Sequence, residues 1–390
     1  MESILSIVDT LLFILFAIQV GYLSVFSFAS RLRHKPIAPA NVQEQKRILL
    51  LIAAYREDRV ILDTVKACLA QDYPHDRYRV MVISDHMNEE TNTRLRALPI
   101  EVLQVDFEKS TNTKSLKAAL THAGPDAPYD IALIVDADNI IKPTYLTELN
   151  AAFACPGVQV VQTHRTAKNL NTNMAYLDAV SEEINNSIFR LGHANLHASS
   201  ALIGSGMAFE YPLFYRAMIT NTSVGGFDRV LEMKLLYEGV FFHYLPDTLI
   251  YDEKIQKLDG FYNQRRRWLA AQYYSFGEFA HFLWPAIKAR RWGFCDKLYQ
   301  QVSFSRLLLL GFSFIASAGC QLFCPALAAK WWGLFGLLLL ALALAIPQKL
   351  WTKQLAKARL LVPYSFLLMF LNLFRMGEAN RRFIHTSHGN

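Results

Sequence analysis

The strongest constraint on how this chain can fold is the position of its long apolar segments, which lie at its two ends. One runs from Ile4 to Ser30 and is interrupted only by Asp9. Two more lie near the C-terminus, from about Leu307 to Leu327 and from Trp331 to Ile346. A helix of about 20 apolar residues crosses a hydrocarbon core of ~30 Å. The sequence therefore predicts an integral membrane protein with a large region outside the bilayer.

Basic residues beside these segments predict their orientation. The first segment has no positive region before it and no small-residue cleavage site, so we expect it to stay as an anchor. Arg31, Arg33 and Lys35 follow it directly, which places the next region in the cytosol, as at a bacterial inner membrane. The two C-terminal segments predict a helical hairpin with Lys330 in its outward turn. The loop after the hairpin is basic and is expected to be cytosolic (Lys349, Lys353, Lys357 and Arg359).

A fourth apolar stretch, Leu360 to Met376, is short for a span and contains Pro363. We interpret it as an interfacial helix in the headgroup region, with a fourth span as the alternative. The net charge of +7 is explained by contact with anionic membrane lipid, and no basic, aromatic-rich module predicts nucleic-acid binding. The five cysteines lack the spacing of a zinc site.

Between residues 45 and 255 short apolar runs alternate with helical stretches. The expected strands are Arg47 to Ala53, Tyr78 to Ser84, Ile100 to Val105, Asp130 to Val135 and Val158 to Thr163, and the expected helices include Asp58 to Gln71 and Ser115 to His122. Continuous apolar strands separated by helices indicate an α/β domain whose mostly parallel sheet is covered on both faces. Ligands of such sheets bind beyond the carboxyl ends of the strands.

Three aspartates stand at those strand ends. Asp85 follows the second strand, and Asp136 and Asp138 follow the fourth. Alternation along an extended chain points the two carboxylates of Asp136 and Asp138 the same way, which suits a hard cation, Mg²⁺ or Mn²⁺, bridging two phosphates of a nucleotide-sugar. A turn at a strand–helix junction is the alternative reading of this Asp-Ala-Asp sequence.

Four motifs, three acidic and one basic, follow one another in an order that is typical of a known protein family. After Asp85 and Asp136-Ala137-Asp138 come Asp228 and then Gln264-Arg265-Arg266-Arg267-Trp268. This D…DxD…D…QxxRW series resembles the membrane-integrated family 2 glycosyltransferases of the cellulose, chitin and hyaluronan synthase type. The resemblance covers roughly residues 45 to 390 and implies a GT-A fold, a Rossmann-like nucleotide-sugar transferase domain, resting on interfacial and transmembrane helices.

The resemblance also implies roles for residues around the donor and the acceptor. Asp85 matches the aspartate that contacts the uracil base, and Tyr55 and Glu57 match the opening motif that lines the nucleoside pocket. Lys114 is similar to a lysine near the donor. Gly204, Ser205 and Gly206 match a stretch under the terminal sugar of the acceptor. Ordinary turns or solvated charges are the alternative for each of these residues.

Asp228 resembles the catalytic base of the family. Leu231, Met233, Leu235, Leu236 and Gly239 reproduce the helix that follows it, but Phe227 replaces the Glu that normally precedes the Asp. This departure makes Glu232, one turn later, a competing candidate. An inverting transfer needs one carboxylate to take the proton of the acceptor hydroxyl as its oxygen attacks the anomeric carbon.

In the Gln264–Trp268 motif, the planar fork of Arg267 suits the donor pyrophosphate, together with Gln264, and Trp268 offers a face on which an acceptor sugar stacks. A basic anchor for an interfacial helix is the alternative. Phe383 to His388 resembles the gating loop that closes over the donor in cellulose synthases, with His388 in place of the usual Lys.

The expected organisation and function follow. We expect an N-terminal transmembrane helix (1–30), a cytosolic GT-A domain (45–255), the QxxRW and interfacial helices (256–300), a transmembrane hairpin (301–348), and a basic loop, interfacial helix and gating-like tail (349–390). The expected enzyme is an inverting, metal-dependent transferase that uses a UDP-sugar. The favoured interpretation is a processive polysaccharide synthase. Three membrane-spanning helices are few for a channel that carries the polymer, so we expect a homo-oligomer or a partner subunit to complete it. The alternative adds a single sugar to a lipid-linked or glycolipid acceptor.

Overall fold

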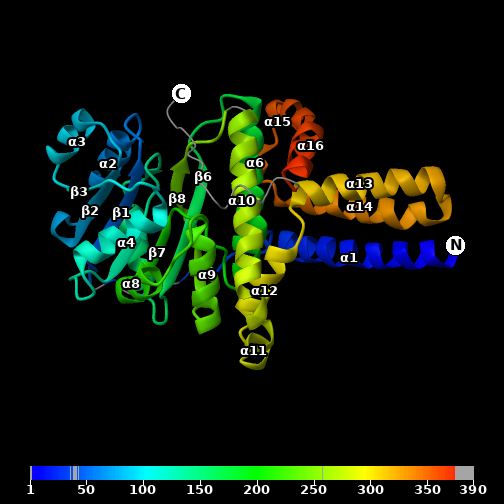
Figure 1. Cartoon of the computed structure of the whole chain (residues 1–390), viewed down its shortest axis with the longest axis horizontal. Helices are drawn as coiled ribbons and strands as arrows, with labels where there is room; N and C mark the ends of the chain where they lie inside the picture. Colours follow the sequence, from blue (N-terminus) through cyan, green and yellow to red (C-terminus); the bar gives the residue numbers. More distant parts are fainter. Residues whose placement is uncertain (1, 36, 38–41, 43, 257, 374–390) are drawn as a thin grey trace.

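An eight-stranded mixed sheet lies at the centre of the larger lobe of the molecule (Figure 1). The computed structural model describes residues 2–35, 37, 42, 44–256 and 258–373. The strands run in the order β3-β2-β1-β4-β7-β6-β8-β5. Their bounds are β1 Ile48–Tyr55, β2 Tyr78–Asp85, β3 Glu101–Val105, β4 Ile131–Ile134, β5 Ile140–Ile141, β6 Val160–Ala167, β7 Met207–Glu210 and β8 Phe242–Asp252.

The sheet is parallel in one half and mixed in the other. β3, β2, β1 and β4 pair in parallel, as predicted, and β6 pairs with β8 in parallel. β7 pairs antiparallel with both β4 and β6, and β5 pairs antiparallel with β8. The prediction of a mostly parallel sheet is therefore wrong for the second half, because the short strands β5 and β7 leave too little periodicity to be recognised.

Alternating side chains of β1 enter two different cores. Leu49 and Leu51 pack on one face of the sheet with residues of α4, α8 and α9, whereas Ile48, Leu50 and Ile52 pack on the other face with residues of α2, α3 and α5. All five side chains are fully buried. Because a strand directs successive side chains to opposite faces, an apolar run without polar interruptions is stable only when both faces are covered.

The helices form two sets. Those on the sheet are α2 Ile61–Leu69, α3 Glu89–Arg96, α4 Asn112–Ala123, α5 Tyr145–Phe153, α8 Tyr211–Ile219 and α9 Phe227–Glu238, with the short turn η1 His75–Arg77. The rest lie between the sheet and the projecting bundle or within that bundle: α1 Glu2–Ala29, α6 Asn173–Asn185, η2 Asn186–Gly192, α7 His193–Asn195, α10 Leu258–Phe279, η3 Ala280–Phe282, α11 Leu283–Lys288, α12 Trp292–Val302, α13 Arg306–Phe323, α14 Pro325–Ala345, η4 Gln348–Leu350, α15 Lys353–Ala358, η5 Arg359–Leu361 and α16 Val362–Leu373.

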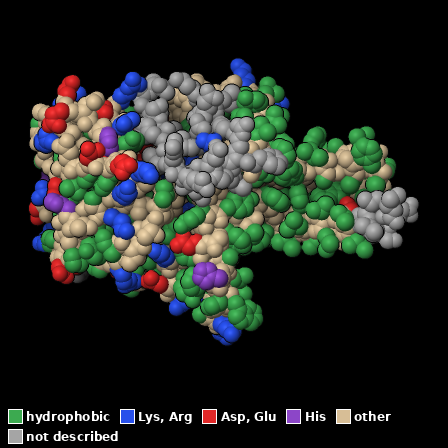
Figure 2. Space-filling model, viewed as in Figure 1, with side chains coloured by type: hydrophobic (Ala, Val, Ile, Leu, Met, Phe, Trp, Pro, Cys, Tyr) green, Lys and Arg blue, Asp and Glu red, His purple; other side chains and the backbone are tan. Residues whose placement is uncertain are grey.

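α1, α13 and α14 project together away from the sheet, across the direction of α6 and α10 (Figure 1). Hydrophobic side chains cover this bundle, while charged side chains gather on the sheet lobe (Figure 2). Four stretches are long and apolar enough to cross a membrane: Ser6–Ala29, Arg306–Phe323, Pro325–Ala345 and Lys353–Leu373. The fourth, which comprises α15, η5 and α16, lies beside α6 and α10 and does not run along the bundle.

Two details of the membrane region differ from the prediction. Cys324 alone separates α13 from α14, so Lys330 lies inside α14 and not in the turn. There it pairs with Asp9 of α1, whose other oxygen accepts a 2.8 Å hydrogen bond from Trp331. A buried charge is retained in an apolar bundle only when it is paired, and sequence alone did not reveal the partner. The basic segment after the hairpin is also largely helical, in η4 and α15, and is not an open loop.

Candidate active site

A cavity of about 680 Å³ lies between the sheet and the projecting bundle. One end is lined by residues at the carboxyl ends of the strands, the middle by α9 and α10, and the other end by α1, α6, α13, α14 and α16. Polar side chains surround the strand end, which we call the donor end. The opposite wall, which we call the membrane end, combines apolar side chains with polar and charged ones of α6 and α13. The apolar ones include Leu23, Leu310, Leu342, Ile346 and Met369, and the charged ones include Asp178, Glu182 and Arg306.

Tyr55 and Glu57 line the donor end, where β1 finishes. Arg56 between them has a positive φ of 55°, which turns the chain sharply out of the strand. The Arg56 guanidinium carbon lies 5.2 Å from the centre of the Tyr55 ring, and the His86 ring meets Tyr55 edge-on at 5.6 Å. The predicted nucleoside-binding residues are therefore held at one corner of the cavity.

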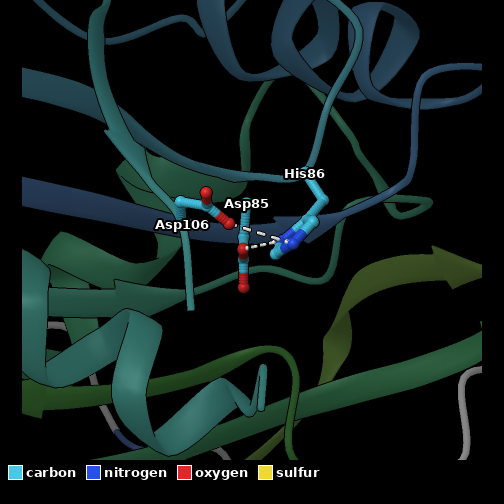
Figure 3. A group of neighbouring side chains, drawn as sticks. All are labelled: Asp85, His86 and Asp106. Carbon is cyan, nitrogen blue, oxygen red and sulfur yellow. Dashed lines mark hydrogen bonds and ion pairs between the residues drawn. The ribbon is translucent and has the colours of Figure 1, made fainter. Parts of the chain in front are cut away.

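Asp85 is buried at the end of β2 beside this corner, and His86 bridges it to Asp106 (Figure 3). His86 Nδ1 lies 2.6 Å from Asp85 Oδ1, and its Nε2 lies 3.0 Å from Asp106 Oδ1. These side chains are of types that bind metals and their ligand atoms lie within 4.8 Å of one another, but each ring nitrogen of His86 is already in contact with a carboxylate. The other oxygen of Asp85, Oδ2, is buried and has no hydrogen-bond partner among the described residues. It is a carboxylate oxygen that remains able to accept an N–H bond.

The loop that carries Asp136 and Asp138 is held by hydrogen bonds from a second loop. Ser205 Oγ accepts from the backbone N–H of Asp136 at 3.0 Å and donates to Asn139 Oδ1 at 2.5 Å. The amide of Asn139 donates to Asp138 Oδ1 at 2.9 Å and to Asp252 Oδ1 at 3.0 Å. Asp136 and Asp138 both line the cavity, so two carboxylates are presented to it from a rigid loop.

Asp228 lies in the first turn of α9, in the middle of the cavity wall. Gly226 begins this helix with a φ of 67°, and a Cβ at this position would lie 2.8 Å from the Cβ of Ala271 on α10. The glycine therefore allows the start of α9 to approach α10 closely. Gly204 lies next to the carboxylate, because a Cβ at Gly204 would lie 3.7 Å from Asp228 Oδ2, within van der Waals contact.

Glu232, the competing candidate, is buried and already engaged. Its Oε1 forms an ion pair with Lys297 Nζ at 3.0 Å and accepts from the backbone N–H of Leu202 at 2.9 Å. These contacts give Glu232 a structural role between α9, α12 and the loop before β7.

Gln264, Arg267 and Trp268 of α10 line the same cavity, as does Arg265. Burial lowers the pKa of the Arg267 guanidinium, and the nearby carboxylates of Asp136 and Asp228 oppose this shift. The Arg265 guanidinium carbon lies 4.4 Å from the Trp268 ring centre, and Arg265 pairs with Asp178 on α6 at 2.7 Å. The structure thus brings the motif helix up against both acidic motifs.

Comparison with known proteins identifies the family of this chain. The family model described as "Glycosyltransferase like family 2" matches residues 45–271, which include the D…DxD…D…QxxRW series but not the gating-like segment at Phe383 to His388. The chain belongs to glycosyltransferase family 2. Members of the family are nucleotide-sugar transferases, and the match ends within the helix that carries Trp268.

Curated family 2 relatives are distant. A probable glycosyltransferase of Bacillus subtilis (strain 168), YdaM, is 21% identical over 68% of this chain and 63% of its own length. An N-acetylglucosaminyltransferase of Rhizobium meliloti (strain 1021) is 25% identical over 59% of this chain and 56% of its own length. The chain therefore spans about three fifths of the length of these relatives.

A solved structure confirms the GT-A fold predicted for this family 2 chain. The mannosyltransferase PcManGT of Pyrobaculum calidifontis, solved with GDP-Man and Mn²⁺, superposes with a TM-score of 0.50 at 17% identity. The superposition covers 84% of this chain and 96% of that one. At this identity the likeness is one of fold, and it extends beyond the sheet domain into the helices that follow.

Some predicted site residues do not line the cavity. Asp85 is one of them, because its side chain is fully buried at the end of β2. Lys114 is exposed on α4, where its Nζ donates to the carbonyl of Lys109 at 2.7 Å, and it does not line the cavity. Ser205 and Gly206 lie behind the wall, so of the three-residue stretch only Gly204 faces the cavity. Ser205 instead supports the Asp136 loop. His388 and the rest of the gating-like segment lie outside the described residues.

A buried ion network that lines the cavity was not predicted from the sequence. Glu182 of α6 accepts from Arg165 at 3.1 Å and pairs with Arg190 at 3.4 Å, while Asp252 pairs with Lys254 at 2.7 Å. Burial raises the pKa of the Glu182 carboxyl, but the surrounding cations outweigh it and bring the pKa to about 2. The available signal was the adjacent pair Glu182-Glu183 in a helix, since two neighbouring carboxylates require partners when they are buried.

Proposed function

We propose that this family 2 enzyme transfers a sugar, with inversion, from a UDP-sugar to a hydroxyl group of a membrane-borne acceptor. One observation carries the proposal: a single cavity is lined by the acidic donor end, by Asp228 and by apolar residues of the membrane helices. Donor and acceptor would meet at Asp228, with the acceptor entering from the bundle.

The donor end fits the parts of a uridine diphosphate. Asp85 stands opposite Tyr55 in the register of β1 and β2 but is buried and does not itself line the cavity. Its second oxygen has no partner among the described residues and would accept the N–H of uracil if the bound nucleotide reaches it, while Tyr55 offers an aromatic face at the cavity wall. Asp136 and Asp138 fit Mg²⁺ or Mn²⁺, since both carboxylates face the cavity from a loop fixed by Ser205 and Asn139. When bound, the ion would neutralise charge on the departing diphosphate.

In the proposed step the hydroxyl oxygen of the acceptor forms a bond to the anomeric carbon of the donor sugar. At the same time, Asp228 takes the proton from that hydroxyl group. The bond from that carbon to the diphosphate oxygen breaks at the same time, and the electron pair leaves with UDP. Asp228 is favoured over Glu232 because Glu232 is held by Lys297 and the Leu202 amide. Arg267, close to both Asp136 and Asp228, would stabilise the charge that develops on the diphosphate.

The membrane end of the cavity favours transfer to a lipid-borne acceptor. Its walls are formed by side chains such as Leu310, Leu342 and Met369. A sugar polymer carries hydroxyl groups that need polar partners, whereas an acyl or prenyl chain is accommodated by such walls. A processive polysaccharide synthase is the second candidate. It is supported by Trp268, which lines the cavity where an acceptor sugar could stack.

Radiolabelled UDP-sugars tested with the purified full chain in lipid and Mn²⁺ would decide between these functions. A single labelled species extractable into organic solvent, lost when EDTA replaces Mn²⁺, is the expected result. A ladder of high-mass product would establish the processive synthase. If no UDP is released from any donor, with or without added lipid, the proposed transferase activity is wrong.

A further inference from the structure

Arg306 is a cation of the membrane end whose guanidinium is only partly engaged. It is the first residue of α13, one of the helices long and apolar enough to cross a membrane, and it lines the cavity. Its Nη2 donates to the carbonyl and the hydroxyl of Ser181 at 3.1 and 3.3 Å. Its Nη1 is buried and has no hydrogen-bond partner among the described residues.

Within the part of the chain that the structure describes, Arg306 forms no ion pair with a carboxylate, and the carboxylates near it are engaged by other cations. Arg265 and Arg190 act on it as like charges and Glu182 as the opposite charge, but Glu182 is already shared by Arg165 and Arg190. Asp178 is taken by Arg265. Among the described residues, the ion pairs beside the cavity link Glu182 and Asp252 to three cations and, separately, Asp178 to Arg265, while Arg306 is a further cation next to them (the three cations are Arg165, Arg190 and Lys254).

An unbalanced guanidinium at the edge of an apolar wall favours an anion with an apolar part. Leu307 and Leu310 continue from Arg306 along α13, and Val362 and Met369 of α16 also line the cavity. Ser365 of α16 adds a buried hydroxyl that has no partner among the described residues. A phosphate ester matches the fork of an arginine and accepts from a hydroxyl, while its hydrocarbon chain fits the wall.

We propose that Arg306 binds the phosphate of a membrane lipid that carries the acceptor hydroxyl into the cavity. The inference rests on the proposed function, because it takes the membrane end of the cavity as the entrance for the acceptor. It adds the chemical class of the acceptor, an amphiphile with a phosphate group next to its hydrocarbon chain, and a residue that recognises it. A free phosphate ion would use the same arginine but not the apolar wall.

The test measures lipid binding apart from transfer. The full chain in neutral detergent is titrated with dioleoyl phosphatidic acid, dioleoylglycerol or inorganic phosphate, and bound lipid is counted by native mass spectrometry. We expect the phosphatidic acid to bind about tenfold more tightly than the dioleoylglycerol, since charge-assisted hydrogen bonds contribute on this scale. Equal binding of the uncharged lipid, or equal binding of inorganic phosphate, would overturn the proposal.

Variants separate the charge from the apolar wall. Arg306→Gln should lose about tenfold in affinity for phosphatidic acid, and Arg306→Lys should retain most of it. Arg33→Gln is the matched control, because Arg33 is an exposed cation just after α1. Leu310→Trp should reduce binding by filling the cavity while leaving the charge in place. Thermal unfolding shows that each variant is folded.

The outcomes for the inference and for the proposed function are distinguishable. Loss of lipid selectivity only in Arg306→Gln supports the inference even if no donor supports transfer. A folded Arg306→Gln protein that binds phosphatidic acid as the wild type does would overturn it, even if transfer to another acceptor is observed.

Discussion

The two ends of the cavity are built in different ways. At the donor end each functional side chain lies within a few residues of a strand end. Some of the partners there are near neighbours in the sequence, as with Asp85 and His86 or Asp138 and Asn139, although Ser205 reaches the Asp136 loop from elsewhere in the chain. At the membrane end the contacts join α6, α10 and α13, which are far apart in the sequence. Short motifs therefore describe the donor end, whereas the membrane end depends on the tertiary fold.

The largest expected effect lies where the two ends meet. Asp228→Asn removes the proposed proton acceptor but keeps the size of the side chain, so kcat should fall about 10²- to 10⁴-fold with little change in the KM of the donor. Release of UDP in the presence of acceptor measures this effect. An Asp228→Asn enzyme with more than a tenth of wild-type kcat would show that another group takes the proton.

Glu232→Gln should affect stability instead of chemistry. Removing the carboxylate leaves Lys297 buried without its ion pair, which costs about 3–5 kcal/mol. Thermal and denaturant unfolding measure this loss, and kcat per folded molecule should stay near the wild-type value. If Glu232→Gln instead abolishes turnover in protein that remains as stable as the wild type, Glu232 replaces Asp228 as the base.

The ion network of the membrane end predicts a dependence of stability on acid. The pKa of Glu182 is lowered from 4.5 to about 2 in the folded protein, so its ionised form stabilises the fold above pH 4.5. This contribution, ~3 kcal/mol, is lost as the pH falls from about 5 towards 2. Unfolding followed between pH 7 and pH 3 measures it. Glu182→Gln should be less stable at pH 7 and should show a shallower decline, and an unchanged slope would contradict the assignment.

The sequence predicted the donor end better than the membrane end for a physical reason. Strand ends, the Asp136 loop and the α10 motif are marked by local patterns, and the structure brings them to one cavity. The antiparallel direction of β7 was not predicted, because the strand Met207–Glu210 is too short for its sequence pattern to be recognised. The pairing of Asp9 with Lys330 and the position of Arg306 depend on packing between distant helices, which no local pattern encodes.

The smallest expected effect concerns recognition of the uracil base at the donor end. Asp85→Asn keeps one acceptor oxygen but removes the charge beside the proposed uracil site, so UDP should bind about tenfold more weakly. Asp106→Asn is the matched control, because Asp106 also contacts His86 but its side chain is 87% exposed; its effect should be under about threefold. Calorimetric titration with UDP and with 3-methyluridine diphosphate, which lacks the N–H, measures both.

The methylated nucleotide makes this comparison specific to one hydrogen bond. If Asp85 Oδ2 accepts from that N–H, wild-type protein should discriminate against the methylated nucleotide, and Asp85→Asn should lose much of this discrimination. A variant that weakens both nucleotides equally would assign Asp85 to holding His86 and the loop, not to reading the base. In that case the donor end would resemble the membrane end. At both ends buried charges would stabilise the fold, and the side chains that face the cavity would select the ligand.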